Sequence, residues 1–336
     1  MNYISDRNKT NIERLRAAID EADAVIAGAG AGLSTSAGFT YSGQRFDRYF
    51  GDFAVKYGFT DMYSGGFYPY RKLTEMWGFW CRNIYVNRYM DPPKDTYSKL
   101  LDILKGKDYF VITTNVDHCF QKAGIDKRRL FYTQGDYGLW QCQSGRIKKT
   151  YDNEEQVKKM LLAEGFRFEH ASLDYHADWG ELIPPTDQSG RTEWSSLKTE
   201  IPAYMLPVCP DDGSPMKMNL RADDTFVEDE GWHEASRRYF EFIEAHKTKK
   251  VLFLDLGSGG NTPVIFKIPF MRWTMDWPDA KYATINEGEA FTAREIAEKS
   301  IVIDADIDSI LEFINTQSKT ITLHVEMEDY HNDKNC

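Results

Sequence analysis

The sequence predicts an α/β protein in which a parallel sheet domain carries an inserted, smaller domain that is irregular or helical. Apolar runs of the length of a buried strand alternate with helical stretches along much of the 336 residues, which is typical of a parallel sheet covered by helices on both faces. Two segments without this rhythm interrupt it and indicate an insertion. With 42% hydrophobic residues, a chain of this length can bury a large core.

The first expected element is a helix that precedes the first strand. Thr10 to Glu13 has the form of a capping box, and Ile12, Leu15 and Ile19 recur at helical spacing. The apolar runs that predict strands are AVIAGAG (24–30), YFVITTN (109–115), LFYTQG (130–135), VLFLDLGSGG (251–260), YATIN (282–286) and SIVIDAD (300–306). Further helices are expected over 234–247 and over 292–299, the latter with the capping pair Thr292 and Glu295.

The interrupting segments set the predicted domain limits. One is dense in aromatic residues and glycine, and the other mixes charge, proline and short apolar pieces. We expect the aromatic residues to form the core of the smaller domain rather than a base-stacking platform. The predicted limits are 1–45, 96–140 and 231–320 for the sheet domain, 46–95 and 141–230 for the smaller domain, and 321–336 for a polar tail.

Composition excludes several classes of partner. The formal charge is −11 and the pI about 5.2, so the field of the whole molecule repels phosphate backbones and anionic lipid, and we expect no nucleic acid and no membrane partner. The first ten residues lack the apolar centre of a signal peptide, and no run of about 18 apolar residues is present, so we expect a cytoplasmic protein. The five cysteines are odd in number and widely spaced, and we expect thiols rather than disulfides.

A glycine-rich turn follows the first predicted strand in VIAGAGAGLSTSAGF (25–39). A turn of this kind between a strand and a helix lets backbone N–H groups approach a pyrophosphate, as in dinucleotide-binding proteins. The spelling departs from the usual fingerprint because position 33 is leucine, and no Gly-Lys-Ser/Thr of a P-loop follows. A tight turn whose serines cap the next helix explains the same letters equally well.

A second glycine corner, LGSGGNTP (256–263), also ends an apolar run. Two bare corners at strand ends of one sheet predict a shared ligand at a topological switch point, with phosphates held from both corners. Asn286 and the turn over 305–307 follow two further strands, in positions suited to a ribose hydroxyl and an adenine edge.

Four blocks of sequence, in order and at sensible spacing, resemble the NAD-binding blocks of sirtuins. They are GAGLSTSAGF (30–39), TTNVDHCFQKAG (113–124), LGSGGNTP (256–263) and the Ile-Asn pair at 285–286. The resemblance covers the predicted sheet domain and matches the smaller domain only faintly. It implies a Rossmann-type domain with NAD as the cofactor, an NAD-dependent deacylase or ADP-ribosyltransferase activity, and a small, usually zinc-binding module.

The resemblance also implies roles for single residues. Asn115 matches the asparagine beside the nicotinamide ribose, and Asp117 matches the aspartate that holds the carboxamide; a strand-end turn and a helix N-cap are the structural alternatives. The full set of expected cofactor-binding residues is Ala31, Gly32, Leu33, Ser34, Arg45, Asn115, Asp117, Gly257, Ser258, Asn286 and Ile307. His118 beside Cys119 suggests a Cys/His nucleophile pair, but adjacent residues at a helix start point apart, so we expect His118 to be an incidental neighbour of the site.

Two departures from the sirtuin pattern bear on the reaction. TYSG (40–43) replaces a Pro-Asp-Phe-Arg run that shapes the nicotinamide pocket, and Arg45 would supply the missing arginine from a shifted position. Gln134 replaces the catalytic histidine, and its amide can hydrogen-bond a ribose but cannot take a proton near pH 7. General-base help is worth about 10²- to 10⁴-fold, so we do not expect efficient deacylation.

Transfer of ADP-ribose to a protein carboxylate is less demanding, because that acceptor is already an anion that the enzyme must mainly orient. We therefore expect Asn115 and Gln134 to act as catalytic residues that order the ribose. The expected zinc ligands are incomplete, because only Cys142 in WQCQSG and Cys209 in PVCPDDG are present where two C-x-x-C pairs would stand. Positions 145 and 212 are glycine and aspartate, so we expect no bound metal.

Glutamine in place of histidine, the lost cysteines and the altered loop together resemble the macrodomain-linked sirtuins called class M. This resemblance implies a protein ADP-ribosyltransferase whose acceptor is a lipoylated carrier similar to the glycine-cleavage H protein. It also implies a macrodomain ADP-ribosyl hydrolase as functional neighbour and a link to oxidative stress. The alternatives are a deacylase of low activity, an NAD glycohydrolase, and an NAD-sensing module without chemistry.

Overall fold

The computed structural model describes residues 6–169, 180–260 and 263–316 of the chain. The predicted polar tail and two residues of the second glycine corner, Asn261 and Thr262, lie outside these ranges. Within them, no helix combines the length and the apolar character that a membrane crossing requires.

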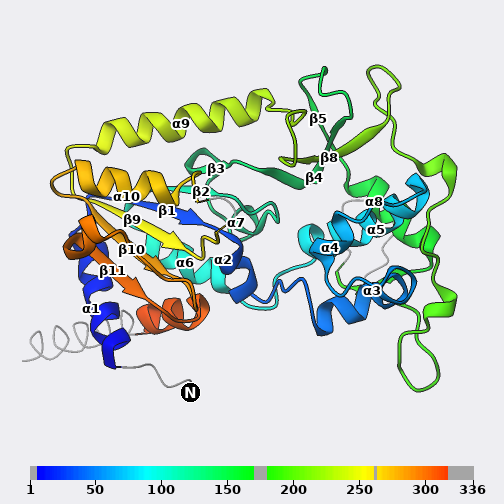
Figure 1. Cartoon of the computed structure of the whole chain (residues 1–336), viewed down its shortest axis with the longest axis horizontal. Helices are drawn as coiled ribbons and strands as arrows, with labels where there is room; N and C mark the ends of the chain where they lie inside the picture. The colour runs from blue at the N-terminus through cyan, green and yellow to red at the C-terminus, as the bar shows by residue number, and fades with distance from the viewer. Residues whose placement is uncertain (1–5, 170–179, 261–262, 317–336) are drawn as a thin grey trace, which may run out of the picture.

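A six-stranded parallel sheet forms the centre of the fold and confirms the predicted α/β class (Figure 1). The strands lie in the order β11-β10-β9-β1-β2-β3, and each neighbouring pair is parallel. The six strands are β1 (Ala24–Ala29), β2 (Asp108–Thr113), β3 (Leu130–Tyr132), β9 (Val251–Leu256), β10 (Lys281–Ile285) and β11 (Ser300–Ile303). The strand order reverses between β1 and β9, so the topological switch point lies beyond the carboxyl ends of these two strands.

Helices cover both faces of this sheet (Figure 1). Val25 and Ala27 of β1 pack with α1, α6 and a helix that begins at 307, whereas Ala24 and Ile26 pack with α9 and α10 on the other face. Because both faces are buried, the strands are continuously apolar instead of alternating. The helices of this part are α1 (Asp6–Glu21), α2 (Ala31–Ser36), α6 (Thr96–Leu104), α7 (Cys119–Lys122), η2 (Lys127–Arg129), α9 (Glu230–His246), α10 (Lys267–Asp276) and η5 (Arg294–Lys299).

Two predicted helix starts are wrong. α1 begins at Asp6, upstream of the capping box. Asn8 in its first turn donates to the Asp304 carbonyl at 3.0 Å, and a contact with so distant a residue cannot be predicted from the local sequence around Thr10. Residues 294–299 form the 3-10 helix η5 instead of an α-helix. The Thr292 hydroxyl lies 2.8 Å from the Ser300 hydroxyl, so it does not cap a backbone N–H.

The rest of the described chain lies to the right of the sheet in Figure 1 and contains short helices and two small antiparallel sheets, β5-β4-β8 and β6-β7. Its strands are β4 (Gly135–Cys142), β5 (Thr150–Asp152), β6 (Arg167–Phe168), β7 (Leu182–Ile183) and β8 (Met216–Leu220). Its helices are α3 (Gln44–Tyr57), α4 (Met62–Gly66), α5 (Leu73–Ile84), the π-helical η1 (Tyr85–Tyr89), α8 (Glu154–Glu164), η3 (Trp194–Ser196) and η4 (Ala203–Met205).

The aromatic residues of this part pack against one another as a core, as expected. The rings of Phe50 and Phe79, for example, have centroids 5.0 Å apart. The same core contains a fully buried arginine, Arg82, whose Nη1 lies 2.7 Å from Asp52 Oδ1 and whose Nε lies 2.8 Å from Glu164 Oε2. A buried guanidinium with two carboxylate partners fixes α5 against α3 and α8.

The expectation of five thiols is wrong for two cysteines. Cys142, at the end of β4, and Cys209, in the segment before β8, form a disulfide with a Cα–Cα distance of 5.6 Å. β4 pairs with β8, and that pairing brings together two cysteines that are 67 residues apart in the sequence. Cys81 and Cys119 are free and buried, and Cys336 lies outside the described residues.

Candidate functional site

The two glycine corners touch each other at the switch point of the sheet. The Gly32 N–H donates to the Gly257 carbonyl at 2.9 Å, and a Cβ added at Gly32 would lie only 2.7 Å from Gly257 Cα. Gly257 has a φ of +69°, in the left-handed region that favours glycine. The bare backbone of the first corner therefore lies against the bare backbone of the second. The two corners meet at one place, as the sequence predicted.

A buried acidic residue, Asp255, forms hydrogen bonds that fix the second corner. Asp255, at the end of β9, is fully buried and accepts hydrogen bonds from Ser258 Oγ at 2.6 Å and from the Tyr282 hydroxyl at 2.7 Å. The Lys267 ammonium lies 3.7 Å from the same carboxylate. Asn286, after β10, donates from its side chain to the Ser258 carbonyl at 3.1 Å. These contacts fix the backbone of the corner, and the sequence offered one signal for them, a charged residue inside the apolar run VLFLDL.

The residues after β2 contact the first corner. Asn115 Nδ2 donates to the Gly30 carbonyl at 2.9 Å, and Ser34 Oγ donates to Asp117 Oδ2 at 2.5 Å. The Tyr97 hydroxyl lies within 3.4 Å of all three side chains, and burial and the charge of Asp117 raise the pKa of Tyr97. Tyr97 is a site residue that the motifs did not reveal, because it lies on α6, far from every glycine-rich block.

The N-cap alternative for Asp117 fits only in part, because the N-cap residue of α7 is His118 and Asp117 precedes it. Asp117 Oδ1 accepts from the Cys119 N–H at 3.0 Å, where α7 begins. Burial and the neighbouring Asp117 charge raise the pKa of the Cys119 thiol, so it stays protonated and cannot act as a thiolate nucleophile. Cys119 therefore does not act as the nucleophile of a Cys/His pair.

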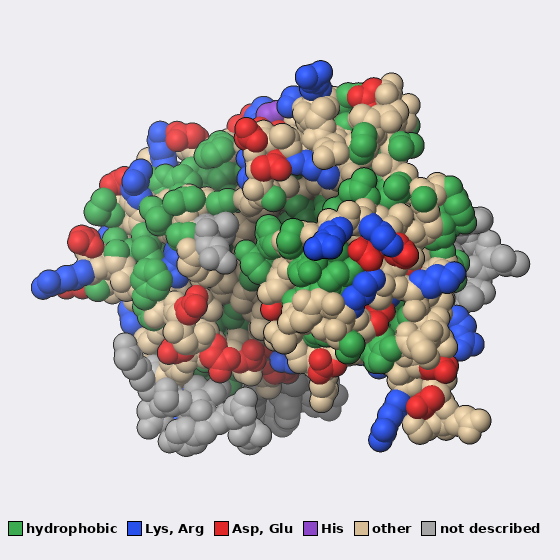
Figure 2. Space-filling view, turned by 45° about the vertical axis from the view of Figure 1, so that its right-hand side comes forward, with side chains coloured by type: hydrophobic (Ala, Val, Ile, Leu, Met, Phe, Trp, Pro, Cys, Tyr) green, Lys and Arg blue, Asp and Glu red, His purple; other side chains and the backbone are tan. Residues whose placement is uncertain are grey.

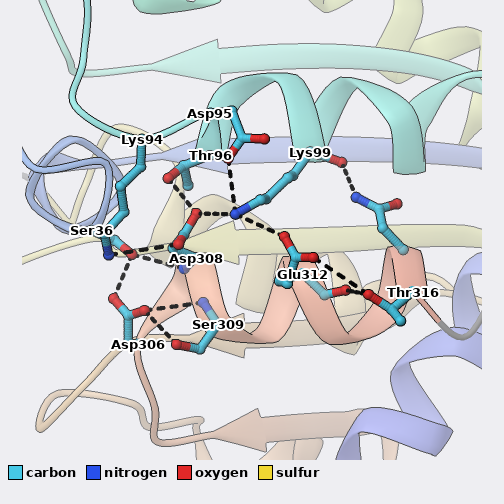
Figure 3. Close-up of polar contacts among 11 residues, drawn as sticks. Ser36, Lys94, Asp95, Thr96, Lys99, Asp306, Asp308, Ser309, Glu312 and Thr316 are labelled. Carbon is cyan, nitrogen blue, oxygen red and sulfur yellow. Dashed lines mark hydrogen bonds and ion pairs between the residues drawn. The ribbon is translucent and has the colours of Figure 1, made fainter. Parts of the chain in front are cut away.

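A polar network anchors the opposite end of α2 to the segment after β11 (Figure 3). Ser36 Oγ donates to Asp306 Oδ1 at 2.6 Å and accepts from the Asp308 N–H at 2.8 Å. Burial opposes ionisation of Asp306, but the hydrogen bonds from Ser36 and Ser309 outweigh it and lower the pKa of Asp306. Ile307 lies between these aspartates, and its side chain belongs to the core, so only its backbone remains for a ligand.

The same network includes a lysine on α6. Lys99 Nζ lies 2.9 Å from Asp308 Oδ1, 2.9 Å from Glu312 Oε2 and 2.9 Å from Asp95 Oδ1 (Figure 3). The Thr96 hydroxyl also donates to Asp308 at 2.6 Å. The predicted adenine end of the site is therefore held rigidly between α2, α6 and the final described helix.

Gln134 lies just beyond β3, at the same edge of the sheet as Asn115. The Thr133 N–H donates to the Thr113 carbonyl at 3.0 Å, which aligns the two strand ends. Gln134 is one of the residues that line a cavity of about 430 Å³ whose wall is mainly apolar and includes Trp232, Tyr239 and Val264. An ion pair between Arg221 Nη2 and Glu228 Oε1, 2.5 Å apart, lines the same cavity.

Arg45 lies on α3 and its hydrogen bonds go to the loop and helix around it. Its Nη1 donates to Asn87 Oδ1 at 2.7 Å and to the Thr40 carbonyl at 3.3 Å, its Nη2 donates to the Val86 carbonyl, and burial lowers its pKa. In the described part of the chain these bonds fix the TYSG loop, whereas Gly32, Ser34, Asn115, Asp117, Gly257, Ser258 and Asn286 contact one another or share partners.

The zinc module that sirtuins usually carry is not matched by the donor atoms present here. Cys142, Cys209 and Asp212 are the three potential ligands that lie together in the described residues, with ligand atoms within 4.8 Å of one another. The two sulfur atoms are bonded to each other, and Asp212 is exposed. A closed zinc site needs four ligands, so these residues do not fit one.

Comparison with known proteins agrees with this architecture. No family model matches the chain. A curated relative named "Protein ADP-ribosyltransferase" from Staphylococcus aureus (strain Mu50) is 35% identical over 312 residues, which are 93% of this chain and 89% of the relative. A second, from Fusarium oxysporum f. sp. cubense, is named "Probable bifunctional ADP-ribose hydrolase/ADP-ribosyltransferase" and is 28% identical over 260 residues, which are 75% of this chain but 38% of that protein.

Solved structures of sirtuins share the fold. A Sir2 variant with a p53 peptide and NAD has a TM-score of 0.52 at 17% identity and covers 92% of this chain and 99% of its own. Sir2 bound to a propionylated peptide has a TM-score of 0.51 at 16% identity, with 92% and 98% covered. These two likenesses concern the fold, and the relative from Staphylococcus aureus establishes the kinship. The chain therefore belongs to the family of protein ADP-ribosyltransferases and has the sirtuin fold.

Proposed function

We propose that this chain binds NAD at the switch point, releases nicotinamide and transfers the ADP-ribosyl group to a side chain of an acceptor protein. The observation that carries the proposal is the contact between the two glycine corners, with Asn115 and Asn286 attached to them from neighbouring strand ends. Ligands of open α/β sheets bind at this point, and kinship with the ADP-ribosyltransferase from Staphylococcus aureus supplies the reaction class.

The expected roles follow the positions of the residues. The phosphates lie against 31–34 and against Gly257 and Ser258, Asn286 and the backbone at Ile307 face the adenosine, and Asp117 holds the carboxamide. When bound, NAD supplies an ADP-ribosyl group whose bond to the positively charged nicotinamide ring is already weakened. Asn115 and Gln134 orient the ribose, and Arg45 shapes the nicotinamide side through the TYSG loop, with which it shares a hydrogen bond.

We propose further that the acceptor is a lipoylated carrier similar to the glycine-cleavage H protein. The mainly apolar cavity beside Gln134 supports this proposal, because the hydrocarbon part of a lipoyl arm could pack along its apolar wall. Exposed Phe240 and Val264 belong to its wall, and Figure 2 shows that hydrophobic side chains gather in several patches on the face drawn.

The relative from Fusarium oxysporum, whose name joins a hydrolase to a transferase, supports a functional link to a macrodomain-type ADP-ribosyl hydrolase and hence to class M. We also propose a cytoplasmic location and the discontinuous division into a sheet domain and a smaller domain given above. Three groups of core residues, two on the faces of the six-stranded sheet and one around the aromatic helices, support that division.

Intact mass spectrometry tests the proposal. The chain is incubated with NAD and with a lipoylated H-like carrier, its unlipoylated form, or an acyl-lysine peptide. A gain of one ADP-ribose on the lipoylated carrier alone supports both the reaction and the acceptor. Deacylation of the peptide with an unchanged carrier would favour a deacylase, free ADP-ribose would favour a glycohydrolase, and NAD-dependent thermal stabilisation without released nicotinamide would favour a sensing module.

The substitution Gln134→His distinguishes ADP-ribosyl transfer from deacylation. We expect the variant to gain deacylation of the acyl-lysine peptide, because a histidine at this strand end can take a proton near neutral pH. The unmodified chain is the control in the same assay. If the variant gains none and keeps its fold, Gln134 does not occupy the position that the sirtuin histidine would take.

A further inference from the structure

His118 lies between the two segments that carry the proposed catalytic residues. It follows Asn115 and Asp117 in the loop after β2, and its ring contacts Asp136, two residues beyond Gln134. Its φ is +65°, and it is the single non-glycine residue with a positive φ among the residues that the structure describes. That conformation costs about 1–2 kcal/mol for an L-residue. Backbone strain of this kind gathers at functional sites.

Asp136 fixes the orientation of the His118 ring. His118 Nδ1 lies 2.6 Å from Asp136 Oδ2, while Asp136 Oδ1 accepts from Arg88 Nε at 2.7 Å and from the Gly138 N–H at 2.7 Å. Burial opposes ionisation of Asp136, but the hydrogen bond from His118 and the charge of Arg88 outweigh it and lower the pKa of Asp136. An ionised carboxylate only accepts hydrogen bonds, so Nδ1 is the nitrogen that donates to it. A neutral imidazole in this orientation carries its lone pair on Nε2.

The surroundings leave this lone pair available. The His118 side chain is 29% exposed, and no hydrogen bond from a protein group to Nε2 occurs in the described ranges of the chain. The charged and titratable groups near His118 are Asp136 on β4, Arg88 on η1, and Asp117, Cys119 and Lys122 along its own segment. An Asp-oriented histidine with an open Nε2 is the arrangement that general-base catalysis uses.

We propose that His118, oriented by Asp136, is the general base for acceptors that carry a proton. Gln134 cannot take that proton, and the Cys119 thiol is held protonated. The Asp117 carboxylate already accepts from Ser34 Oγ and from the Cys119 N–H and is assigned to the carboxamide, so His118 is the remaining candidate for a base. In the step, the bond between ribose C1′ and nicotinamide breaks and its electron pair leaves with neutral nicotinamide. A lone pair of the acceptor forms the new bond to C1′, and the acceptor's proton moves to His118 Nε2. The Asp136 carboxylate stabilises the resulting imidazolium.

This inference rests on the proposed function and extends it to hydroxyl, thiol or amine acceptors and to water. The test compares the unmodified chain with H118N, because asparagine tolerates a positive φ and its amide can still donate to Asp136, but it has no base. H118G is a second variant that removes the ring without backbone strain. H233N is the matched control, since His233 is an exposed histidine on α9.

Two rates are measured between pH 5 and 9, nicotinamide release from NAD alone and ADP-ribose transfer to the lipoylated carrier. We expect H118N and H118G to lower nicotinamide release from NAD alone by about 10²- to 10⁴-fold, because the acceptor is then water, which carries a proton. Transfer to a carboxylate of the carrier, which is already an anion, should fall far less. A general base acts only in its unprotonated form, so the pH dependence of nicotinamide release should differ between the two His118 variants and the pair formed by the unmodified chain and H233N. Thermal stabilisation by NAD should be equal in all four proteins.

The outcomes separate this inference from the proposed function. If H118N and H118G release nicotinamide as fast as H233N with the same pH profile, His118 is not the base although the proposed reaction stands. If both rates fall by the same factor at every pH and the pH profile keeps its shape, His118 only positions the segments and the inference is wrong. If the unmodified chain releases no nicotinamide with either acceptor, both the proposed function and this inference are overturned.

Discussion

The contact between the two glycine corners leads to a quantitative prediction for Gly257→Ala. The new methyl group would lie 2.6 Å from Gly32 Cα and 2.6 Å from the Leu33 N atom, so the two corners must move apart. Overpacking of this kind costs about 1–3 kcal/mol. The φ of +69° adds about 1–2 kcal/mol for any L-residue. We therefore expect the free energy of unfolding to fall by about 2–5 kcal/mol.

Two glycines separate the causes of this loss. Gly106 has a φ of +84° and nothing within 4 Å of an added Cβ, so G106A should lose only the backbone contribution of about 1–2 kcal/mol. Gly259 lies in the same corner as Gly257, has no neighbour within 4 Å and no left-handed φ, so G259A should change stability by less than about 0.5 kcal/mol.

The assay is denaturant unfolding of the three variants and the unmodified chain, with and without NAD. We expect the order of stability to be G259A, then G106A, then G257A. G257A should also lose most of the stabilisation that NAD confers, whereas G106A should keep it. Equal stability of G257A and G106A would refute the reasoning, because it would show that the contact between the corners tolerates a methyl group.

Three further predictions concern the site and the smaller core. Asn115→Ala should abolish nicotinamide release while far-UV circular dichroism and thermal unfolding stay native; surviving turnover would contradict the assignment of the segment after β2. Arg82→Met should lower the free energy of unfolding by about 3–5 kcal/mol, because it leaves two buried carboxylates unpaired, whereas an Arg237→Met control on the exposed face of α9 should cost far less; equal losses would contradict the role of the buried ion pairs. The double substitution of Cys142 and Cys209 by serine should cost about 4 kcal/mol under oxidising conditions, from the loop of 67 residues that the disulfide closes, and a reductant should remove this difference between the variant and the unmodified chain.

Local patterns predicted the sheet well. Each strand of the six-stranded sheet coincides with an apolar run, because burial on both faces demands continuous apolar residues. The meeting of the corners after β1 and β9 was also predictable, since parallel strands place their carboxyl ends at one edge. The capping pattern at Thr10 did not mark the start of α1, which begins upstream, where Asn8 donates to the distant Asp304 carbonyl. The pattern at Thr292 failed because its hydroxyl bonds the Ser300 hydroxyl instead of a backbone N–H.

The candidate site was only partly readable from the sequence. Tyr97 and Asp136 carry no motif, and they reach the site because α6 and β4 pack beside the loop after β2. The disulfide was missed for a similar reason, since the antiparallel pairing of β4 with β8 brings its cysteines together. His118 was noted in the sequence, but its partner Asp136 lies 18 residues further along the chain, beyond β3. The sequence therefore suggested the neighbouring Cys119 as its partner instead.

The position of β1 in the sheet has a consequence for synthesis of the protein. β1 leaves the ribosome among the first elements, yet one of its two neighbours, β9, follows only after the aromatic core and both small sheets have been made. Until these later segments are made, one edge of β1 and the face of the sheet that packs with α9 and α10 have no partner. Such a surface favours aggregation and chaperone binding. We therefore expect slow folding governed by this long-range pairing, and truncation before β9 should give an insoluble or chaperone-bound chain.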